Sequence, residues 1–328
     1  MYYQHYGLIE NPFSLAPNPR FVFLSEAYKE ALATLYYGLL EGKGFIVLSG
    51  EPGTGKTLLL NAIRARTGHR WKLIVVAGDP LLSFEDLLWE ILNGLGGRAS
   101  RDASGYRVKM AIGRALSRED ERGRKVVLVI DEAQTLSPEV LERVRLLSNF
   151  ETVERKLLQI VLVGQPNLVE TIDRSDLAQL KQRVALWCRL SPLPSKEVSP
   201  YIQSRLVAAG RKDDGLFVRS AKERVAVLSR GIPRLINVLC ENALLLGFAE
   251  GLSRIELRIV DRAATKLWGG EGNDTGRPQA DTSFQAEPRT SAAGLGWRPD
   301  WGDLARLLVV AITGLMVLVL MGWNLLER

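Results

Sequence analysis

The chain reads FIVLSGEPGTGKT from Phe45 to Thr57, an apolar run followed at once by a glycine-rich loop. The part from Gly50 to Thr57 fits the pattern G-x-x-x-x-G-K-[ST], which marks a phosphate-binding loop when it lies between a strand and a helix. In such a loop the backbone N–H groups at the helix start form a concave anion site, and glycines let a phosphate approach closely. The alternative is a glycine-rich turn that happens to precede a helix. Spacing and context together favour a nucleotide-binding α/β domain.

Two side chains of this loop have expected chemical roles. Lys56 is expected to contact the β- and γ-phosphates as a catalytic group, and the Thr57 hydroxyl is expected to bind Mg²⁺. The sequence has no N-K-x-D motif for reading guanine, so the predicted nucleotide is ATP, with Mg²⁺ as its metal ion. The residues of this stretch that are predicted to contact the nucleotide are Gly50, Glu51, Pro52, Gly53, Thr54, Gly55, Lys56, Thr57 and Leu58.

A second apolar run, KVVLVI from Lys125 to Ile130, continues into Asp131 and Glu132. In a phosphate-loop ATPase an acid at the carboxyl end of such a strand holds Mg²⁺, directly or through water, and this is the role expected for Asp131. Glu132 is expected to be the carboxylate that polarises the attacking water. An acidic turn after a buried strand is a common alternative. The phosphate-binding loop earlier in the chain favours the catalytic interpretation.

Three further polar residues are predicted to complete the site. Gln165 follows an apolar run and is expected to contact the γ-phosphate or the water, with Asn167 as second candidate and a plain polar turn as the alternative. Arg183 immediately precedes the next apolar run and is expected to act as an arginine finger, in a neighbouring subunit's site if it faces one. Arg234 begins a helix and is expected to reach the nucleotide, unless it only caps that helix or forms a surface ion pair.

The alternation of apolar runs and amphipathic stretches predicts an α/β fold, with a parallel sheet buried on both faces. The predicted strands are 45–49, 72–76, 125–130, 157–163 and 184–190. After Pro194 the pattern is helical, which predicts a small α-helical lid domain with helices 195–209, 219–229, 233–250 and 256–268. The predicted divisions are 1–194 for an N-terminal segment plus ATPase core, 195–268 for the lid, 269–303 for a linker and 304–326 for a single C-terminal transmembrane helix.

The last part of the chain has two contrasting compositions. Residues 269–303 are rich in Gly, Pro, Ser, Thr and charge and lack apolar periodicity, which is typical of a flexible linker. Residues 304–326 are mostly apolar and would form a helix ~34 Å long, enough to cross a hydrocarbon core. Arg298 before this segment and Arg306 near its N-terminal end predict that the N-terminus of the chain is cytoplasmic. The alternative, a buried core helix, is not expected after a polar linker.

The composition argues against several other classes of protein. The 328 residues include 46% hydrophobic and 24% charged residues, as in an ordinary globular protein. Two histidines and two cysteines leave little material for a His-based metal site, a Ser-His-Asp triad or a disulfide framework, so Cys188 and Cys240 are expected to be small buried thiols. The net charge of +6 permits contact with nucleic acid or an anionic membrane without showing either. No basic region followed by an apolar core opens the chain, so no secretory signal is expected.

Taken together, the phosphate-binding loop, the acidic strand end, Gln165, Arg183 and Arg234 resemble the AAA+ ATPases. The stretches GLIENPFSLAPNPR (7–20), VGQP (163–166) and GIPR (231–234) are similar to the general secretion pathway protein A family and to related ATPases of pilus and exosortase-linked exopolysaccharide systems. The resemblance covers residues 1 to about 268. It implies an ATP-hydrolysing enzyme in the cytoplasm, held at the inner membrane by one helix, that assembles or remodels a secretion or exopolysaccharide export complex. The implied partners are envelope export proteins and further copies of the chain.

The secretion branch of that family usually continues beyond the membrane helix into a periplasmic peptidoglycan-binding domain, whereas few residues follow Trp323 here, so cell-wall binding is not expected. Two other functions stay open. A DNA-binding AAA+ regulator of the transposition type has a similar core, but basic residues are interspersed with acids along this chain and form no tract interleaved with aromatic residues, so nucleic acid is not an expected partner. A nucleotide-gated scaffold without hydrolysis would not need Lys56, Asp131 and Glu132 together.

Overall fold

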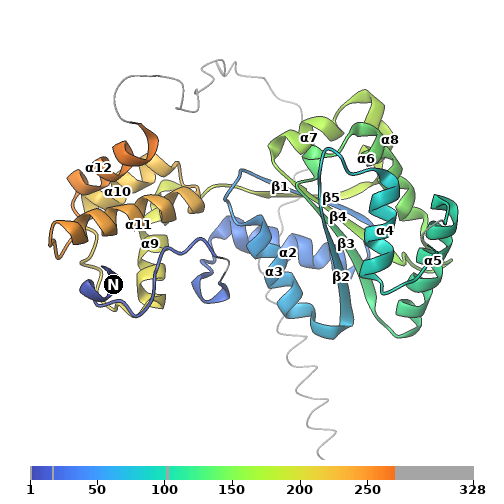
Figure 1. The fold of residues 1–328 in the computed structure, drawn as a ribbon, viewed down its shortest axis with the longest axis horizontal. Coiled ribbons are helices and arrows are strands. Elements are labelled where there is room, and N and C mark those ends of the chain that lie inside the picture. Colours follow the sequence, from blue (N-terminus) through green and yellow to red (C-terminus); the bar gives the residue numbers. More distant parts are fainter. Residues whose placement is uncertain (1, 17, 101–102, 270–328) are drawn as a thin grey trace, which may run out of the picture. The chain divides into compact units, whose positions relative to one another are not determined.

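A five-stranded parallel sheet forms the centre of the α/β core, with the strand order β2-β3-β4-β1-β5 (Figure 1). The computed structural model describes residues 2–16, 18–100 and 103–269. All five predicted strands are confirmed, and their bounds are β1 Phe45–Gly50, β2 Trp71–Ala77, β3 Lys125–Asp131, β4 Leu158–Gly164 and β5 Val184–Leu190. Because the strands are parallel, their carboxyl ends meet at one edge, where the loops after β1, β3 and β4 come together.

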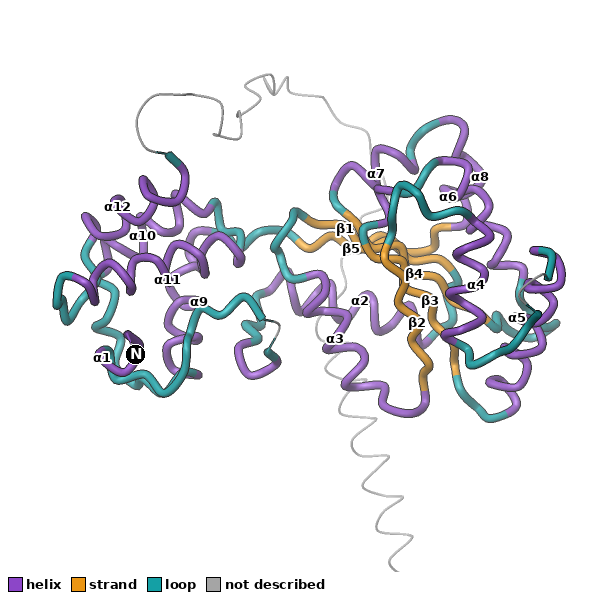
Figure 2. The backbone as a smooth tube through the Cα atoms, viewed as in Figure 1, coloured by secondary structure: helices purple, strands orange, loops and turns teal. Residues whose placement is uncertain are grey.

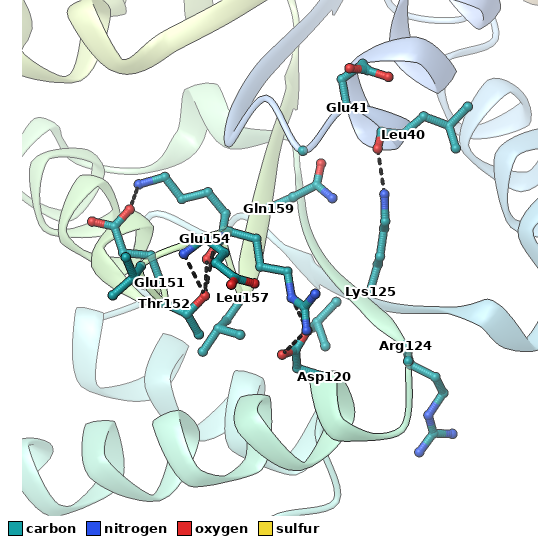
Figure 3. Close-up of a pocket in the computed structure, with 16 residues that line it drawn as sticks. Leu40, Glu41, Asp120, Arg124, Lys125, Glu151, Thr152, Glu154, Leu157 and Gln159 are labelled. Atoms are coloured by element: carbon teal, nitrogen blue, oxygen red, sulfur yellow. Dashed lines mark hydrogen bonds and ion pairs between the residues drawn. The ribbon is translucent and has the colours of Figure 1, made fainter.

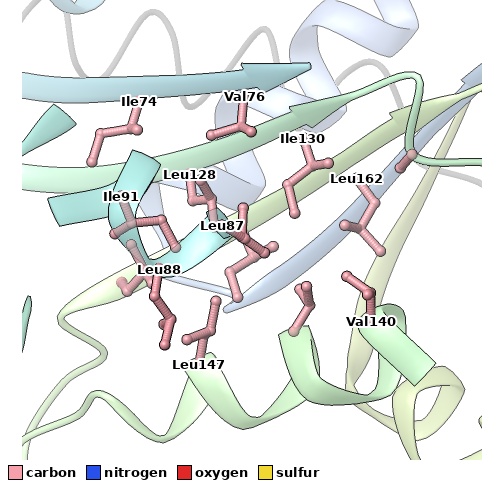
Figure 4. Packing of buried hydrophobic residues seen from close by; sticks show 14 of the residues in the cluster. Ile74, Val76, Leu87, Leu88, Ile91, Leu128, Ile130, Val140, Leu147 and Leu162 are labelled. Carbon is pink, nitrogen blue, oxygen red and sulfur yellow. The ribbon is translucent and has the colours of Figure 1, made fainter. Parts of the chain in front are cut away.

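Helices cover both faces of this sheet, which explains the continuous apolar runs in the sequence (Figure 2). In β1, Phe45 and Val47 join the buried cluster of one face, and Ile46 and Leu48 join that of the other. The first cluster packs β2, β3 and β4 residues against α4 and α6, as Figure 4 shows. The helices of the core are α2 Glu26–Leu40 and α3 Lys56–Thr67 on the second face, and α4 Phe84–Gly94, α5 Gly105–Glu121, α6 Pro138–Arg145, α7 Pro166–Ile172 and α8 Ala178–Arg183 on the first.

The predicted helical stretches after Pro194 form a separate cluster, here called the helical domain. Its helices are α9 Ser195–Ala208, α10 Arg219–Ser229, α11 Pro233–Ala249 and α12 Leu257–Trp268. Cys240 is fully buried among them, and Cys188 is buried in the sheet, as predicted for small apolar thiols. Burial raises the pKa of the Cys188 thiol to about 11, so this thiol stays protonated at neutral pH.

The first residues of the chain pack with the helical domain, although the predicted division grouped them with the core. Tyr6 and Phe13 are buried in its cluster, and the short helix α1 (Tyr2–His5) lies against α11. Arg205 of α9 donates to the carbonyl of Pro12 at 2.5 Å and to that of Ser14 at 3.0 Å. Tyr6 and Phe13 therefore pack beneath the helices of the helical domain.

The predicted linker 269–303 and transmembrane helix 304–326 lie outside the described residues, apart from Gly269. Among the helices that the structure describes, none combines the length and the apolar character needed to cross a membrane.

Candidate active site

The loop from Gly50 to Thr57 wraps closely around the start of α3, directly after the buried strand β1. Gly55 is the N-cap residue of α3 and has a φ of 105°, a left-handed conformation that a residue with a side chain rarely adopts. At Gly50 a Cβ atom would lie 2.6 Å from the carbonyl oxygen of Leu190, so the loop backbone passes tightly beside β5. The result is a small backbone cradle at the N-terminus of a helix, a geometry suited to phosphates.

Lys56 lies in this cradle and is 7% exposed. Its ammonium group donates to the carbonyl oxygens of Gly50 at 2.8 Å and of Glu51 at 3.2 Å. Burial lowers the pKa of Lys56, while the carboxylates of Glu132, Asp131 and Glu51 act in the opposite direction. The Lys56 ammonium is thus held over the loop by two neutral carbonyl oxygens. A phosphate bound in the loop would give this ammonium a negatively charged partner.

Asp131 and Glu132 lie at the carboxyl edge of the sheet, at the end of β3. Burial raises the pKa of Asp131, and its Oδ1 atom accepts a hydrogen bond from the Glu132 backbone N–H at 3.0 Å. Glu132 has a φ of 51°, a left-handed conformation that is uncommon outside glycine and often marks a functional turn. Thr57 and Asp131 supply the hydroxyl and the carboxylate that Mg²⁺ uses alongside nucleotide phosphates, so the residues present fit the ion.

Gln134, which the sequence did not single out, links Glu132 to the residue that follows β4. Its Nε2 donates to Glu132 Oε2 at 2.5 Å, and its Oε1 accepts from the backbone N–H of Gln165 at 3.1 Å. The Gln165 side chain also donates to Glu132 Oε2, at 3.4 Å. Asn167, the second candidate, lies in the first turn of α7, where its carbonyl accepts from Thr171. In the sequence, only the closeness of Gln134 to Glu132 pointed to a role for Gln134. No sequence motif indicates the left-handed backbone turn at Glu132 that directs the Gln134 side chain back to the carboxylate.

The helical domain contacts the phosphate-binding loop through Arg234, at the start of α11. The Arg234 backbone N–H donates to the carbonyl of Gly53 at 3.2 Å. A Cβ atom on Gly53 would lie 2.5 Å from Arg234 Cβ, so only glycine fits between loop and helix. The Arg234 side chain is exposed beside the cradle. The structure thus brings Arg234 to the phosphate-binding loop, as well as Asp131, Glu132 and Gln165 to the same edge of the sheet.

Arg183 is the one predicted site residue that the fold keeps away from this cluster. It is the exposed last residue of α8 and directly precedes β5. In the sheet Val184 pairs with Phe45 and Leu190 pairs with Gly50, so Arg183 and the phosphate-binding loop lie at opposite ends of the strands. At ~3.3 Å per residue this separation is about 20 Å. Arg183 therefore cannot reach the phosphates bound to its own chain through a change of rotamer.

We expect that replacing Gln134 with leucine lowers kcat for ATP about tenfold and leaves the KM for ATP unchanged, because the hydrogen bond that orients Glu132 is lost. Steady-state ATP hydrolysis measures both constants. Gln134 would act through Glu132, so adding Gln134→Leu to a Glu132→Gln variant should cause little further loss. A tenfold loss in that double variant as well would show that Gln134 does not work by positioning Glu132.

Comparisons with known proteins place these features in a family context. Residues 39–172, which include the phosphate-binding loop and Glu132, match the family model described as an AAA domain. General secretion pathway protein A of Aeromonas hydrophila is 39% identical over 269 residues. That alignment covers 82% of this chain and 49% of the relative, so the chain spans about half the length of the relative.

Solved structures with a similar fold are much more distant in sequence. Cdc6p from Pyrobaculum aerophilum has a TM-score of 0.62 at 18% identity, covering 81% of this chain and 73% of that one. The Aeropyrum pernix ORC2 protein has a TM-score of 0.59 at 17% identity, and the alignment covers 78% of this chain and 71% of the ORC2 chain. The Thermotoga maritima RuvB Holliday junction branch migration motor has a TM-score of 0.51 at 21% identity, and the alignment covers 76% of this chain and 70% of the RuvB chain. At these identities the likeness concerns the fold alone.

Proposed function

Because this chain belongs to the AAA+ P-loop ATPases related to general secretion pathway protein A, we propose that it hydrolyses ATP to assemble or remodel a cell-envelope export complex. The predicted family and the predicted class of enzyme, an ATP hydrolase, are confirmed by these matches. The observation that carries the proposed role is the 39% identity to a secretion pathway protein over 82% of the chain. The related exopolysaccharide export systems are the other envelope setting for such an ATPase.

In the proposed reaction, Lys56 and the backbone of the loop bind the β- and γ-phosphates of ATP. Mg²⁺ bound by Thr57 and Asp131 would neutralise charge on the phosphates. Glu132 accepts a proton from the attacking water as the water oxygen bonds to the γ-phosphorus, while the bond from that phosphorus to the β,γ-bridging oxygen breaks and ADP leaves. Gln165 and Gln134 orient Glu132. The contact between Arg234 and Gly53 supports a role for the helical domain in sensing the nucleotide.

The proposal includes a homo-oligomer, since Arg183 would complete the site of a neighbouring subunit. Its exposure and its distance of about 20 Å from its own phosphate-binding loop support this assignment. ATP turnover per subunit should then rise steeply as the protein concentration rises, and should not respond to duplex DNA. Stimulation by DNA that disappears with added salt would instead favour the DNA-binding regulator of the transposition type. A turnover that is independent of concentration would contradict the shared site.

The proposal also places the ATPase core in the cytoplasm, anchored to the inner membrane by residues 304–326. The mostly apolar sequence of that segment supports the anchor. Alkaline extraction of membranes from cells that produce the full chain should leave the protein in the membrane pellet. A variant truncated after residue 269 should be released. Release of the full chain would contradict the anchor without affecting the ATPase assignment.

A further inference from the structure

A polar hollow lies between the end of α4 and the middle of α5, and none of the residues that line it belongs to the candidate active site. It has a volume of about 420 Å³. The turn Gly96–Gly97 after α4 forms one wall, and Ala111 and Ala115 of α5 form another. Four arginines line it, namely Arg98, Arg114, Arg118 and Arg122.

The only carboxylate among the lining residues, Glu119, is already neutralised by other groups. Glu119 is 3% exposed and forms ion pairs with Lys72 at 3.5 Å, Arg122 at 3.5 Å and Arg124 at 2.7 Å. Three cations therefore share one buried acid, and the hollow keeps an excess of positive charge.

The remaining three arginines have no counter-ion in the part of the chain that the structure describes. No hydrogen bond or ion pair engages the guanidinium group of Arg98, Arg114 or Arg118 within those residues. Arg114 and Arg118 follow each other at one-turn spacing on α5, about 6 Å along the helix, so they repel each other. An anion bound between them would remove this repulsion.

In a neighbouring hollow, by contrast, the basic side chains have partners within the protein (Figure 3). It lies near the amino ends of β3 and β4 and has a volume of about 490 Å³. There Lys125 donates to the Leu40 carbonyl, Arg155 donates twice to Asp120 at 2.9 Å, and Lys156 pairs with Glu151. The cations that line that hollow are satisfied by the protein itself, which is not so for Arg98, Arg114 and Arg118.

We propose that the hollow lined by Arg98, Arg114 and Arg118 binds a small phosphate ester, either a free phosphorylated metabolite or the headgroup of an anionic phospholipid. Guanidinium groups bind phosphate oxygens in pairs, and a volume of about 420 Å³ suits one phosphorylated group. A nucleic acid duplex would instead need basic residues spread over a wide face. The inference does not depend on the proposed export role.

The lipid source is included because the exposed edge of α5 continues into apolar residues. Tyr106 and Met110 are 73% and 47% exposed and precede Arg114 at the same four-residue spacing. Exposed apolar side chains next to basic ones are typical of a protein surface that lies at the boundary between the acyl chains and the headgroups of a membrane.

The test uses the full chain in phosphatidylcholine vesicles with saturating Mg-ADP, which keeps the phosphate-binding loop occupied. Phenylglyoxal modification of each arginine is followed by mass spectrometry, with glycerol 3-phosphate added or with phosphatidylglycerol replacing part of the lipid. The modification rate at Arg98, Arg114 and Arg118 should fall about fivefold or more with at least one of these ligands. Protection by glycerol 3-phosphate identifies a free metabolite as a source, and protection by phosphatidylglycerol alone identifies the headgroup. The exposed Arg64, Arg66 and Arg70 should show no protection.

A matched pair of variants completes the experiment. Arg98→Gln/Arg114→Gln/Arg118→Gln should weaken binding of the protecting ligand, measured by equilibrium dialysis or vesicle titration, about tenfold or more. Arg64→Gln/Arg66→Gln/Arg70→Gln removes the same charge elsewhere and should bind as the parent does. The proposal is overturned by a lack of protection with both ligands or by equal effects of the two triple variants.

Discussion

Replacing Arg183 with alanine is expected to lower ATP turnover about 10³-fold or more, with ATP affinity unchanged. An arginine finger stabilises negative charge that develops only during phosphoryl transfer, so its loss affects kcat and not binding of the ground state. Arg183 is exposed and about 20 Å from its own phosphate-binding loop, so its removal disturbs no contact of that loop. Turnover assays and equilibrium binding of a fluorescent ATP analogue measure the two effects separately.

Mixing two inactive variants shows whether Arg183 acts in a neighbouring subunit. An Arg183→Ala subunit keeps an intact phosphate-binding loop, and a Lys56→Ala subunit keeps an intact Arg183. Where the two meet in an oligomer, one complete site forms, so the mixture should recover part of the parent activity. Lys181→Ala, on the same helix and paired with Asp173, should behave as the parent. If the mixture stays inactive although mixed oligomers form, Arg183 is not a finger in trans.

Replacing Lys56 with alanine is expected to weaken ATP binding about 100-fold or more, and turnover falls with it. The buried ammonium is the cation that the cradle offers to the phosphates, and its loss leaves the carbonyl oxygens of Gly50 and Glu51 facing them. Isothermal titration with ATP and Mg²⁺ measures the affinity. Lys43→Ala is a suitable control because Lys43 is exposed and precedes β1, at the opposite edge of the sheet. Equal affinity in the Lys56→Ala variant would contradict the site.

The parts of the fold with a strong local pattern could be predicted from the sequence. The strands β1 to β5 are continuous apolar runs, and α9 to α12 follow in a stretch without such runs, so their bounds agree with the structure to within one residue or so. The cradle at Gly50 to Thr57 could also be predicted, because its motif is local. Residues 304–326 lie outside the described part, so the predicted transmembrane helix stays a prediction.

Features that depend on contacts between distant segments could not be predicted. The link from Gln134 to Gln165 joins two strand ends through a left-handed turn at Glu132 that no motif announces. The burial of Tyr6 with α11 joins residues at the two ends of the described chain. The arginine-lined hollow was also missed, because Arg98 and Arg114 come together only when α4 packs on α5. Along the sequence Glu119 and Asp120 directly follow Arg118, but in the fold their carboxylates pair with other cations.

The packing of the N-terminal segment on the helical domain has a mechanical consequence. The backbone joins the two parts of the ATPase twice, once between β5 and α9 and once between the segment held by Arg205 and helix α2. With two backbone connections, the helical domain can rotate relative to the core mainly about the line through these two connections, and other rotations are restricted. Movement of the phosphate-binding loop, passed on through Gly53 and Arg234, should therefore emerge as rotation about a single axis. Under the proposed function, such a joint would turn a small change at the bound nucleotide into movement of the helical domain in one direction.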